Sequence, residues 1–184
     1  MQLRKVLFKE AVDYSQFERF ARSLSWSMVE EHPGDEETPE HISWLTPDGT
    51  TVMILFDDVL NLSYVSVVGD NATAAETALR QHFSSFDWAE AATRFGEATS
   101  ADEKIRSLSV LAVTAPQEFE ELPYNAIRTA LEDDEPGVRS AAVVATIYAR
   151  WAEFMPYLER VAADPANGPE VRETAEAVIE TIRG

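Results

Sequence analysis

A short motif recurs in the second half of the chain at a fixed spacing of 33 residues. Ile105-Arg106, Val138-Arg139 and Val171-Arg172 each place an arginine directly after a branched aliphatic residue. The preceding segments match at the same spacing, because Leu122-Pro123-Tyr124 aligns with Met155-Pro156-Tyr157. A fixed period of this length indicates a structural repeat, and it strongly limits the architectures that the chain can adopt.

The apolar residues within each repeat have helical spacing. Those that follow Val138 are Ala141, Ala142, Ala145 and Ala149, at the separations of three and four residues that give a helix one buried face. The pattern predicts two helices in each repeat. The first helices are expected at about 88–98, 118–132 and 152–163, and the second helices at about 102–115, 136–149 and 168–182.

Local signals mark the starts of the second helices. Ser100 and Glu103 have the spacing of a capping box, and Pro136 and Pro169 suit a first helical turn. One helix pair cannot bury its apolar side alone, whereas stacked pairs share a core. We therefore predict an α-solenoid of about three helix pairs over 87–184, with units at about 87–116, 117–150 and 151–184.

The middle repeat carries a family resemblance. Segment 133–139 reads Asp-Asp-Glu-Pro-Gly-Val-Arg and is followed by small residues. This resembles a HEAT repeat in the compact form found in many bacterial proteins, and the resemblance covers 87–184, about half the chain. A period of 33 residues is also the ankyrin length, but the ankyrin Thr-Pro-Leu-His box is absent.

The resemblance implies a role for the three repeated arginines. In HEAT-like stacks, an arginine at this position commonly bonds an acidic residue in the turn of a neighbouring unit, so Arg106, Arg139 and Arg172 are expected to form a structural ladder. The first turn, 99–102, lacks the acidic-proline motif, which leaves the Arg106 rung without an expected partner. A basic row for an acidic partner is the alternative.

The first 86 residues have a different pattern. We expect a strand at 2–9, a helix from Asp13 to about Glu31, three strands around 42–44, 51–56 and 62–68, and a second helix from about Thr73 that buries His82. Thr46-Pro47-Asp48-Gly49 is a strong turn signal. The strand at 51–56 is apolar on both faces, which suggests a central position. The order β-α-β-β-β-α predicts an α+β domain over 1–86, with about four strands and two helices.

Composition excludes several classes of protein. The 33 acidic side chains oppose 15 basic ones, giving a net charge of −18, and such a field disfavours direct nucleic-acid binding. There is no cysteine for disulfides or thiol catalysis. No apolar run is long enough to span a membrane, and the N-terminus does not read as a signal peptide, so a cytoplasmic location is expected.

The candidate site residues fall into several groups. Oxygen and imidazole ligands crowd into 32–41, which makes His32, Glu37 and His41 weak metal candidates. Asp57 and Asp58 form a carboxylate pair after the central strand, although aspartate is also ordinary turn chemistry. The candidates for a partner interface are the aromatic residues and exposed acids of the repeats: Trp88, Tyr124, Trp151, Tyr157, Glu103 and Glu173.

These features favour a non-catalytic adaptor that needs no cofactor and binds a protein or peptide through its helical repeats, and the acidic surface would suit a basic partner. One alternative is an acidic nucleic-acid mimic that inhibits a DNA-binding protein. Another is a metal-dependent enzyme that uses the N-terminal domain. The acidity also fits a solvated surface adapted to high salt.

Overall fold

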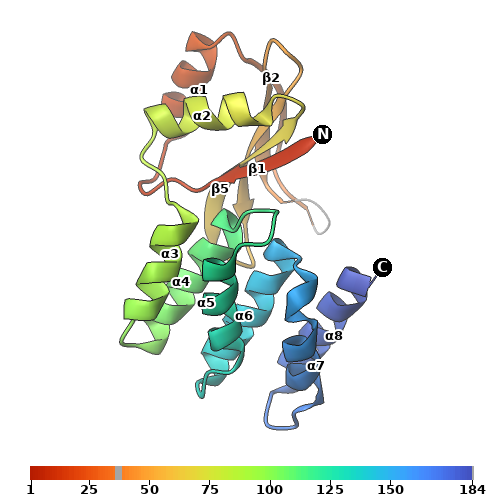
Figure 1. The fold of residues 1–184 in the computed structure, drawn as a ribbon. Coiled ribbons are helices and arrows are strands. Elements are labelled where there is room, and N and C mark those ends of the chain that lie inside the picture. The colour runs from red at the N-terminus through yellow and green to blue at the C-terminus, as the bar shows by residue number, and fades with distance from the viewer. Residues whose placement is uncertain (36–38, 184) are drawn as a thin grey trace. The chain divides into compact units, whose positions relative to one another are not determined.

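The computed structural model describes residues 1–35 and 39–183, and the chain divides into two compact units, residues 1–86 and 87–184 (Figure 1). The N-terminal unit is α+β, and the C-terminal unit is built of packed helices. We describe each unit by itself.

The N-terminal unit is built on a five-stranded antiparallel sheet with strand order β1-β5-β4-β3-β2. The strands are β1 (Gln2–Val6), β2 (Ser27–His32), β3 (His41–Leu45), β4 (Thr51–Asp57) and β5 (Leu62–Gly69). The two-sided apolar strand β4 lies in the middle of the sheet, which confirms the prediction of a central strand. The predicted turn after β3 is held by Thr46, whose backbone N–H donates to the Thr50 carbonyl at 2.9 Å.

Helices α1 (Tyr14–Ser23) and α2 (Ala72–His82) lie against one face of this sheet (Figure 1). Aromatic packing dominates the core between them, because the Phe17 ring lies 4.7 Å from Trp44 and 5.9 Å from Phe83. Asp13 caps α1 by accepting from the Gln16 N–H at 2.7 Å, as its sequence position predicts.

The expectation of about four strands, with the first helix running to about Glu31, is wrong. The helix ends at Ser23, and residues 27–32 form the edge strand β2. Ser25 adopts a left-handed conformation with φ of 60°, and the Trp26 N–H returns to the Ala21 carbonyl at 2.9 Å. This is a Schellman termination with serine where glycine is usual, and the Trp26 ring seals it by packing on Phe20 at 5.4 Å.

The described part of the C-terminal unit contains six α-helices and a short 3-10 turn, η1. The α-helices are α3 (Trp88–Glu97), α4 (Ala101–Thr114), α5 (Glu121–Leu131), α6 (Pro136–Ala149), α7 (Met155–Ala163) and α8 (Pro169–Arg183), and η1 (Ala152–Phe154) precedes α7. All six α-helices lie close to the ranges predicted from periodicity. The Ser100 capping box is present, and Pro136 and Pro169 begin their helices.

These helices pack in a regular order (Figure 1). Each consecutive pair is in contact: α3 with α4, α5 with α6, and α7 with α8. Helices two places apart also touch, so that α3, α5 and α7 form one row and α4, α6 and α8 form the other. The fully buried residues Leu108, Val138 and Leu158 belong to this shared interior.

Candidate interaction site

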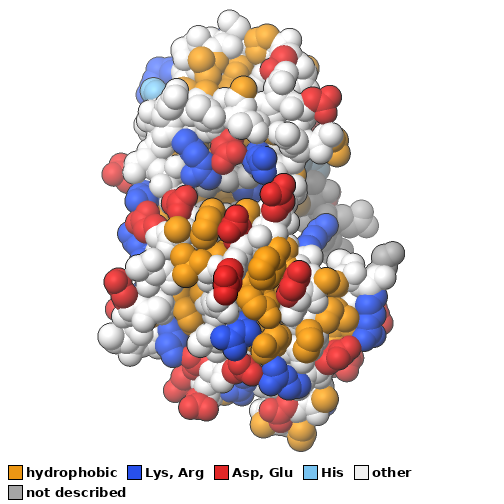
Figure 2. Space-filling view, viewed as in Figure 1, with side chains coloured by type: hydrophobic (Ala, Val, Ile, Leu, Met, Phe, Trp, Pro, Cys, Tyr) orange, Lys and Arg blue, Asp and Glu red, His pale blue; other side chains and the backbone are white. Residues whose placement is uncertain are grey.

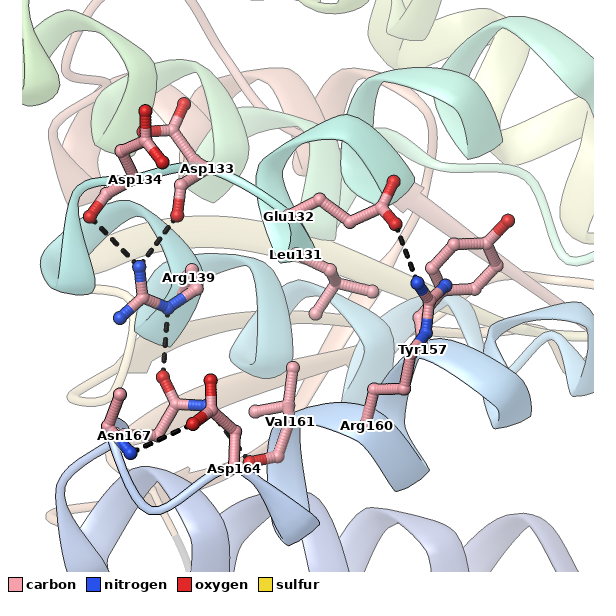
Figure 3. A pocket seen from close by; sticks show the side chains of 11 residues that line it. Leu131, Glu132, Asp133, Asp134, Arg139, Tyr157, Arg160, Val161, Asp164 and Asn167 are labelled. Carbon is pink, nitrogen blue, oxygen red and sulfur yellow. Dashed lines mark hydrogen bonds and ion pairs between the residues drawn. The ribbon is translucent and has the colours of Figure 1, made fainter.

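The turns of the C-terminal unit enclose a polar pocket of about 430 Å³ (Figure 3). The turn between α5 and α6 supplies Glu132, Asp133 and Asp134, and the start of α6 supplies Arg139. The wall opposite is formed by α7 and the turn after it. Its residues are Tyr157, Arg160, Val161, Asp164, Ala166 and Asn167.

Arg139 joins the two turns that border this pocket. Its Nη1 donates to the backbone carbonyls of Asp133 at 2.7 Å and Asp134 at 2.9 Å, and its Nε donates to Asn167 Oδ1 at 2.8 Å (Figure 3). Asn167 is itself buried and donates through Nδ2 to the Val161 carbonyl at 3.0 Å. One guanidinium therefore fixes its own turn and the turn of the next repeat.

Lys104 makes the corresponding connection one repeat earlier. Its Nζ lies 2.6 Å from Asp133 Oδ2. Burial by itself raises the pKa of the Asp133 carboxyl, but the hydrogen bonds from Lys104 and the Glu135 N–H outweigh burial and hold this pKa below its usual value. From its position two residues before Arg106, Lys104 is expected to be an exposed residue available to a partner, whereas in the structure it is partly buried and bound to Asp133.

The three repeated arginines are not equivalent in the structure. Arg106 is exposed and makes no side-chain hydrogen bond or ion pair within the described residues. The Nε of Arg172 is buried and has no hydrogen-bond partner among those residues. Arg139 alone of the three bridges two turns, and its cross-repeat partner is an amide rather than the acidic side chain that the resemblance implied.

Arg160 and Glu132 of the pocket are also paired. Arg160 donates to Glu132 at 2.9 Å, and its guanidinium lies 4.5 Å from the centre of the Tyr157 ring. Arg128 reaches the other Glu132 oxygen at 3.4 Å. Because the arginines of this pocket bond to groups of the protein itself, the pocket is interpreted as a structural junction between turns.

A cluster of aromatic rings joins the loop before α5 to the start of α7. The rings of Phe119 and Tyr124 lie 5.2 Å apart, and Phe119 lies 5.5 Å from Trp151. The Trp151 ring stacks on Phe154 at 5.7 Å, and its Nε1 donates to the Gln117 carbonyl at 3.3 Å. Trp151 is 4% exposed, so this candidate interface residue packs inside the unit and is not available to a partner.

Two apolar side chains of this region face solvent. Phe119 is 45% exposed and Leu122 is 48% exposed, while Tyr124 is half-buried beside them. Figure 2 shows hydrophobic side chains gathered over α5 and α7, with Asp and Glu side chains among them. Sequence pattern did not predict Phe119 or Leu122 as interface residues. Phe119 precedes the N-cap Glu120 and Tyr124 is the fourth helical residue, which is the spacing of a hydrophobic staple.

Four carboxylates border these apolar side chains. Glu118 and Glu120 flank Phe119 in the chain, and Glu121 precedes Leu122. The Tyr124 hydroxyl donates to the backbone carbonyl of Glu153 at 3.5 Å. Burial is the main cause that raises the pKa of Tyr124, followed by its hydrogen bond with Tyr157. The charge of Arg128 opposes this rise, and the charge of Glu153 adds to it. None of the four side chains forms an ion pair within the described residues. We name Phe119, Leu122, Tyr124 and these four glutamates the Phe119 surface.

The other interface candidates are placed as follows. Glu103 is exposed, but its carboxylate accepts from the Thr99 N–H at 2.8 Å and the Ser100 N–H at 3.2 Å, so it serves the cap of α4. Trp88 and Tyr157 are half-buried. Glu173 is exposed on α8 together with Glu170, Glu176 and Glu180.

The glutamates of α8 are too sparse to copy a nucleic-acid strand. They recur every three or four residues, which on a helix means about 5 Å of axis for each charge. A strand of duplex DNA carries one charge in about 3.4 Å. Nucleic-acid mimicry stays a prediction without a specific observation in its favour.

The metal candidates of the N-terminal unit are only partly described. The rings of His32 and His41 stack with centroids 5.2 Å apart, and Glu37 lies outside the described residues. Nδ1 of His41 donates to the Pro39 carbonyl at 2.9 Å, and Nδ1 of His32 accepts from the Gly34 N–H at 3.1 Å. Residues 1–35 and 39–183 contain no group of three side chains suited to hold a metal ion.

The remaining candidates of this unit, Asp57, Asp58 and His82, lie at a turn and at a helix end. Asp57 accepts from the Leu60 N–H at 3.0 Å, which is turn chemistry, and Asp58 is exposed. The expectation that His82 is buried is wrong. Its ring is exposed at the end of α2 and stacks on Phe20 at 4.7 Å, because the helix ends there and the chain turns away.

No helix in the described residues combines the length and the apolar character required to cross a membrane. Comparison with known proteins gave no relatives: no family model matches this chain, and neither a curated protein nor a solved structure matches it significantly.

Proposed function

We propose that this chain is a non-catalytic module that binds a protein or peptide, and that its C-terminal unit is a HEAT-like α-solenoid. The packing order supports the architecture, because each helix contacts its pair partner and the equivalent helix of the next pair. The 33-residue spacing supports it too, as do the turn connections from Lys104 and Arg139 to the following repeat.

The observation that carries the proposed activity is the Phe119 surface. Phe119 and Leu122 stay about half exposed, and every other large apolar residue of the described helical unit is buried or partly buried. Aromatic side chains contribute much of the energy of protein interfaces. The clamp between Trp151 and the Gln117 carbonyl holds the loop in place, so a partner would meet a preformed surface.

In-cell photo-crosslinking of the full chain tests this function. A photoreactive amino acid is placed at Leu122 on α5, at Glu173 on α8, or at the exposed Val59 of the N-terminal unit. We expect discrete crosslinked species of higher mass from at least one of the two C-terminal positions. Crosslinks confined to Val59, or absent from all three positions, would contradict binding through the helical repeats.

A further inference from the structure

The Phe119 surface combines two properties that point to one kind of partner. Its centre is apolar and half exposed, and its border is acidic. On the same unit, some glutamates are paired with arginines: Glu90 with Arg94 at 2.7 Å, and Glu159 with Arg183 at 2.7 Å. The exposed Glu173 and Glu176 of α8 form no ion pair within the described residues either, but no exposed large apolar side chain belongs to that helix.

The border of the Phe119 surface lacks such compensation. Glu118, Glu120, Glu121 and Glu153 form no ion pair within the described residues. The cation whose charge acts on Tyr124, Arg128, is paired with Glu132 at 3.4 Å, so the border keeps an excess of negative charge. Complementary charge across an interface speeds association and rejects partners of the wrong sign. An apolar or acidic partner would leave this field uncompensated, whereas a lysine-rich or arginine-rich partner would neutralise it.

We propose that the Phe119 surface binds a basic amphipathic peptide segment, such as a helix with one apolar side. The apolar side chains of the segment pack on Phe119, Leu122 and Tyr124, and its lysines or arginines face the four glutamates. This assignment rests on the proposed protein-binding function and adds to it the place of binding and the chemistry of the partner.

Fluorescence anisotropy with synthetic peptides tests the proposal on the full chain. The probe is a labelled amphipathic helical peptide of leucine, alanine and lysine. A peptide of the same composition in scrambled order, and one with glutamate in place of lysine, serve as comparisons. We expect the amphipathic basic peptide to bind, the scrambled peptide to bind at least tenfold more weakly, and the acidic peptide not to bind.

Variants then locate the site. Leu122→Ala removes an exposed anchor and should weaken binding about tenfold, which corresponds to roughly 1.4 kcal/mol. The double variant Glu118→Gln/Glu121→Gln should weaken binding and reduce its salt dependence. The matched double variant Glu173→Gln/Glu176→Gln removes the same charge from α8 and should leave the affinity unchanged.

Several outcomes would overturn the proposal: no binding of the basic peptide, equal losses in the two double variants, or an unchanged affinity of Leu122→Ala. Circular dichroism of each variant confirms that the fold is intact. If crosslinks form at Glu173 but not at Leu122, and the basic peptide does not bind, this assignment fails while the protein-binding function stands. If no position crosslinks, the protein-binding function fails as well.

Discussion

The three repeated arginines allow one substitution to be compared at equivalent positions of one fold. Methionine keeps the aliphatic stem of arginine and has a similar helix propensity, so Arg→Met mainly removes the guanidinium. At Arg139 this change deletes three hydrogen bonds and leaves the Oδ1 of the buried Asn167 without its donor. A hydrogen bond to a charged group contributes about 1.5–3 kcal/mol, which we reduce to about 1 kcal/mol each because Arg139 is part-exposed.

We therefore expect Arg139→Met to lower the free energy of unfolding of the C-terminal unit by about 3 kcal/mol. For a unit of this size, the melting temperature should fall by roughly 10 °C or more. Arg106→Met should change the stability by less than about 0.5 kcal/mol, since Arg106 makes no bond within the described residues. Arg172→Met should be neutral or stabilising, because it removes a buried Nε that has no partner there.

Urea denaturation followed by circular dichroism at the helix band measures all three variants, with separate transitions fitted for the two units. The reasoning is refuted if Arg106→Met costs as much as Arg139→Met. It is also refuted if Arg139→Met costs less than about 0.5 kcal/mol, since the bridge between turns would then contribute nothing.

Three further predictions concern other residues. Ser25→Gly should stabilise the N-terminal unit by roughly 0.5–1 kcal/mol in urea denaturation, because glycine accepts the left-handed conformation at less cost; Asn61→Gly, also at positive φ, should change stability less, because asparagine tolerates it. In Asp133→Asn, the free energy of unfolding should fall less on acidification than it does in the unchanged protein. The pKa of Asp133 is lower when folded, so its contribution is present above its unfolded pKa of about 3.9 and disappears as the pH falls through the folded value; thermal melts at about pH 5 and pH 3 measure this. Glu173→Lys should raise stability by roughly 0.5 kcal/mol at low salt, because it replaces the two like-charge neighbours Glu170 and Glu176 on α8 with opposite-charge pairs.

Each of these predictions has a contrary result. Equal gains from Ser25→Gly and Asn61→Gly would mean that the Schellman turn carries no strain of its own. An unchanged acid profile in Asp133→Asn would remove the Lys104–Asp133 pair as a source of pH dependence. A gain from Glu173→Lys that persists at about 1 M salt would show that it does not arise from charge, since exposed charges there interact over only about 3 Å.

The sequence predicted one half of the candidate site and missed the other. Tyr124 was found because it repeats at 33 residues, as Tyr157 does. Phe119 and Leu122 were not predicted as site residues. Helical periodicity identifies the side chains that a helix buries, and these two stay half exposed. The spacing from Phe119 to Tyr124 is the signal of a hydrophobic staple, which could have drawn attention to this loop.

Interactions between repeats were beyond the reach of sequence pattern. The repeated motif predicts the same role for Arg106, Arg139 and Arg172. Their hydrogen bonds depend instead on which side chain or carbonyl of the neighbouring turn lies within reach. Lys104 rather than Arg106 reaches the second turn, and an asparagine receives Arg139. From sequence, Trp151 is likewise a candidate for the surface, but in the structure it is buried and donates a hydrogen bond to the Gln117 carbonyl in the loop before α5.

The sequence by itself determined the helix pairs, their caps and the central strand, because these follow from contacts between residues a few positions apart or from simple alternation. Only the tertiary structure decided that the first helix stops at Ser23 and that β2 follows. Leu24 and Met28 continue the helical spacing, but the turn at Ser25 and the packing of Trp26 on Phe20 favour the strand. The same holds for the Phe119 surface. Six of its seven residues lie within 118–124, but Glu153 and the Trp151 ring that supports Phe119 come from more than 25 positions away, and only the packed helices bring them there.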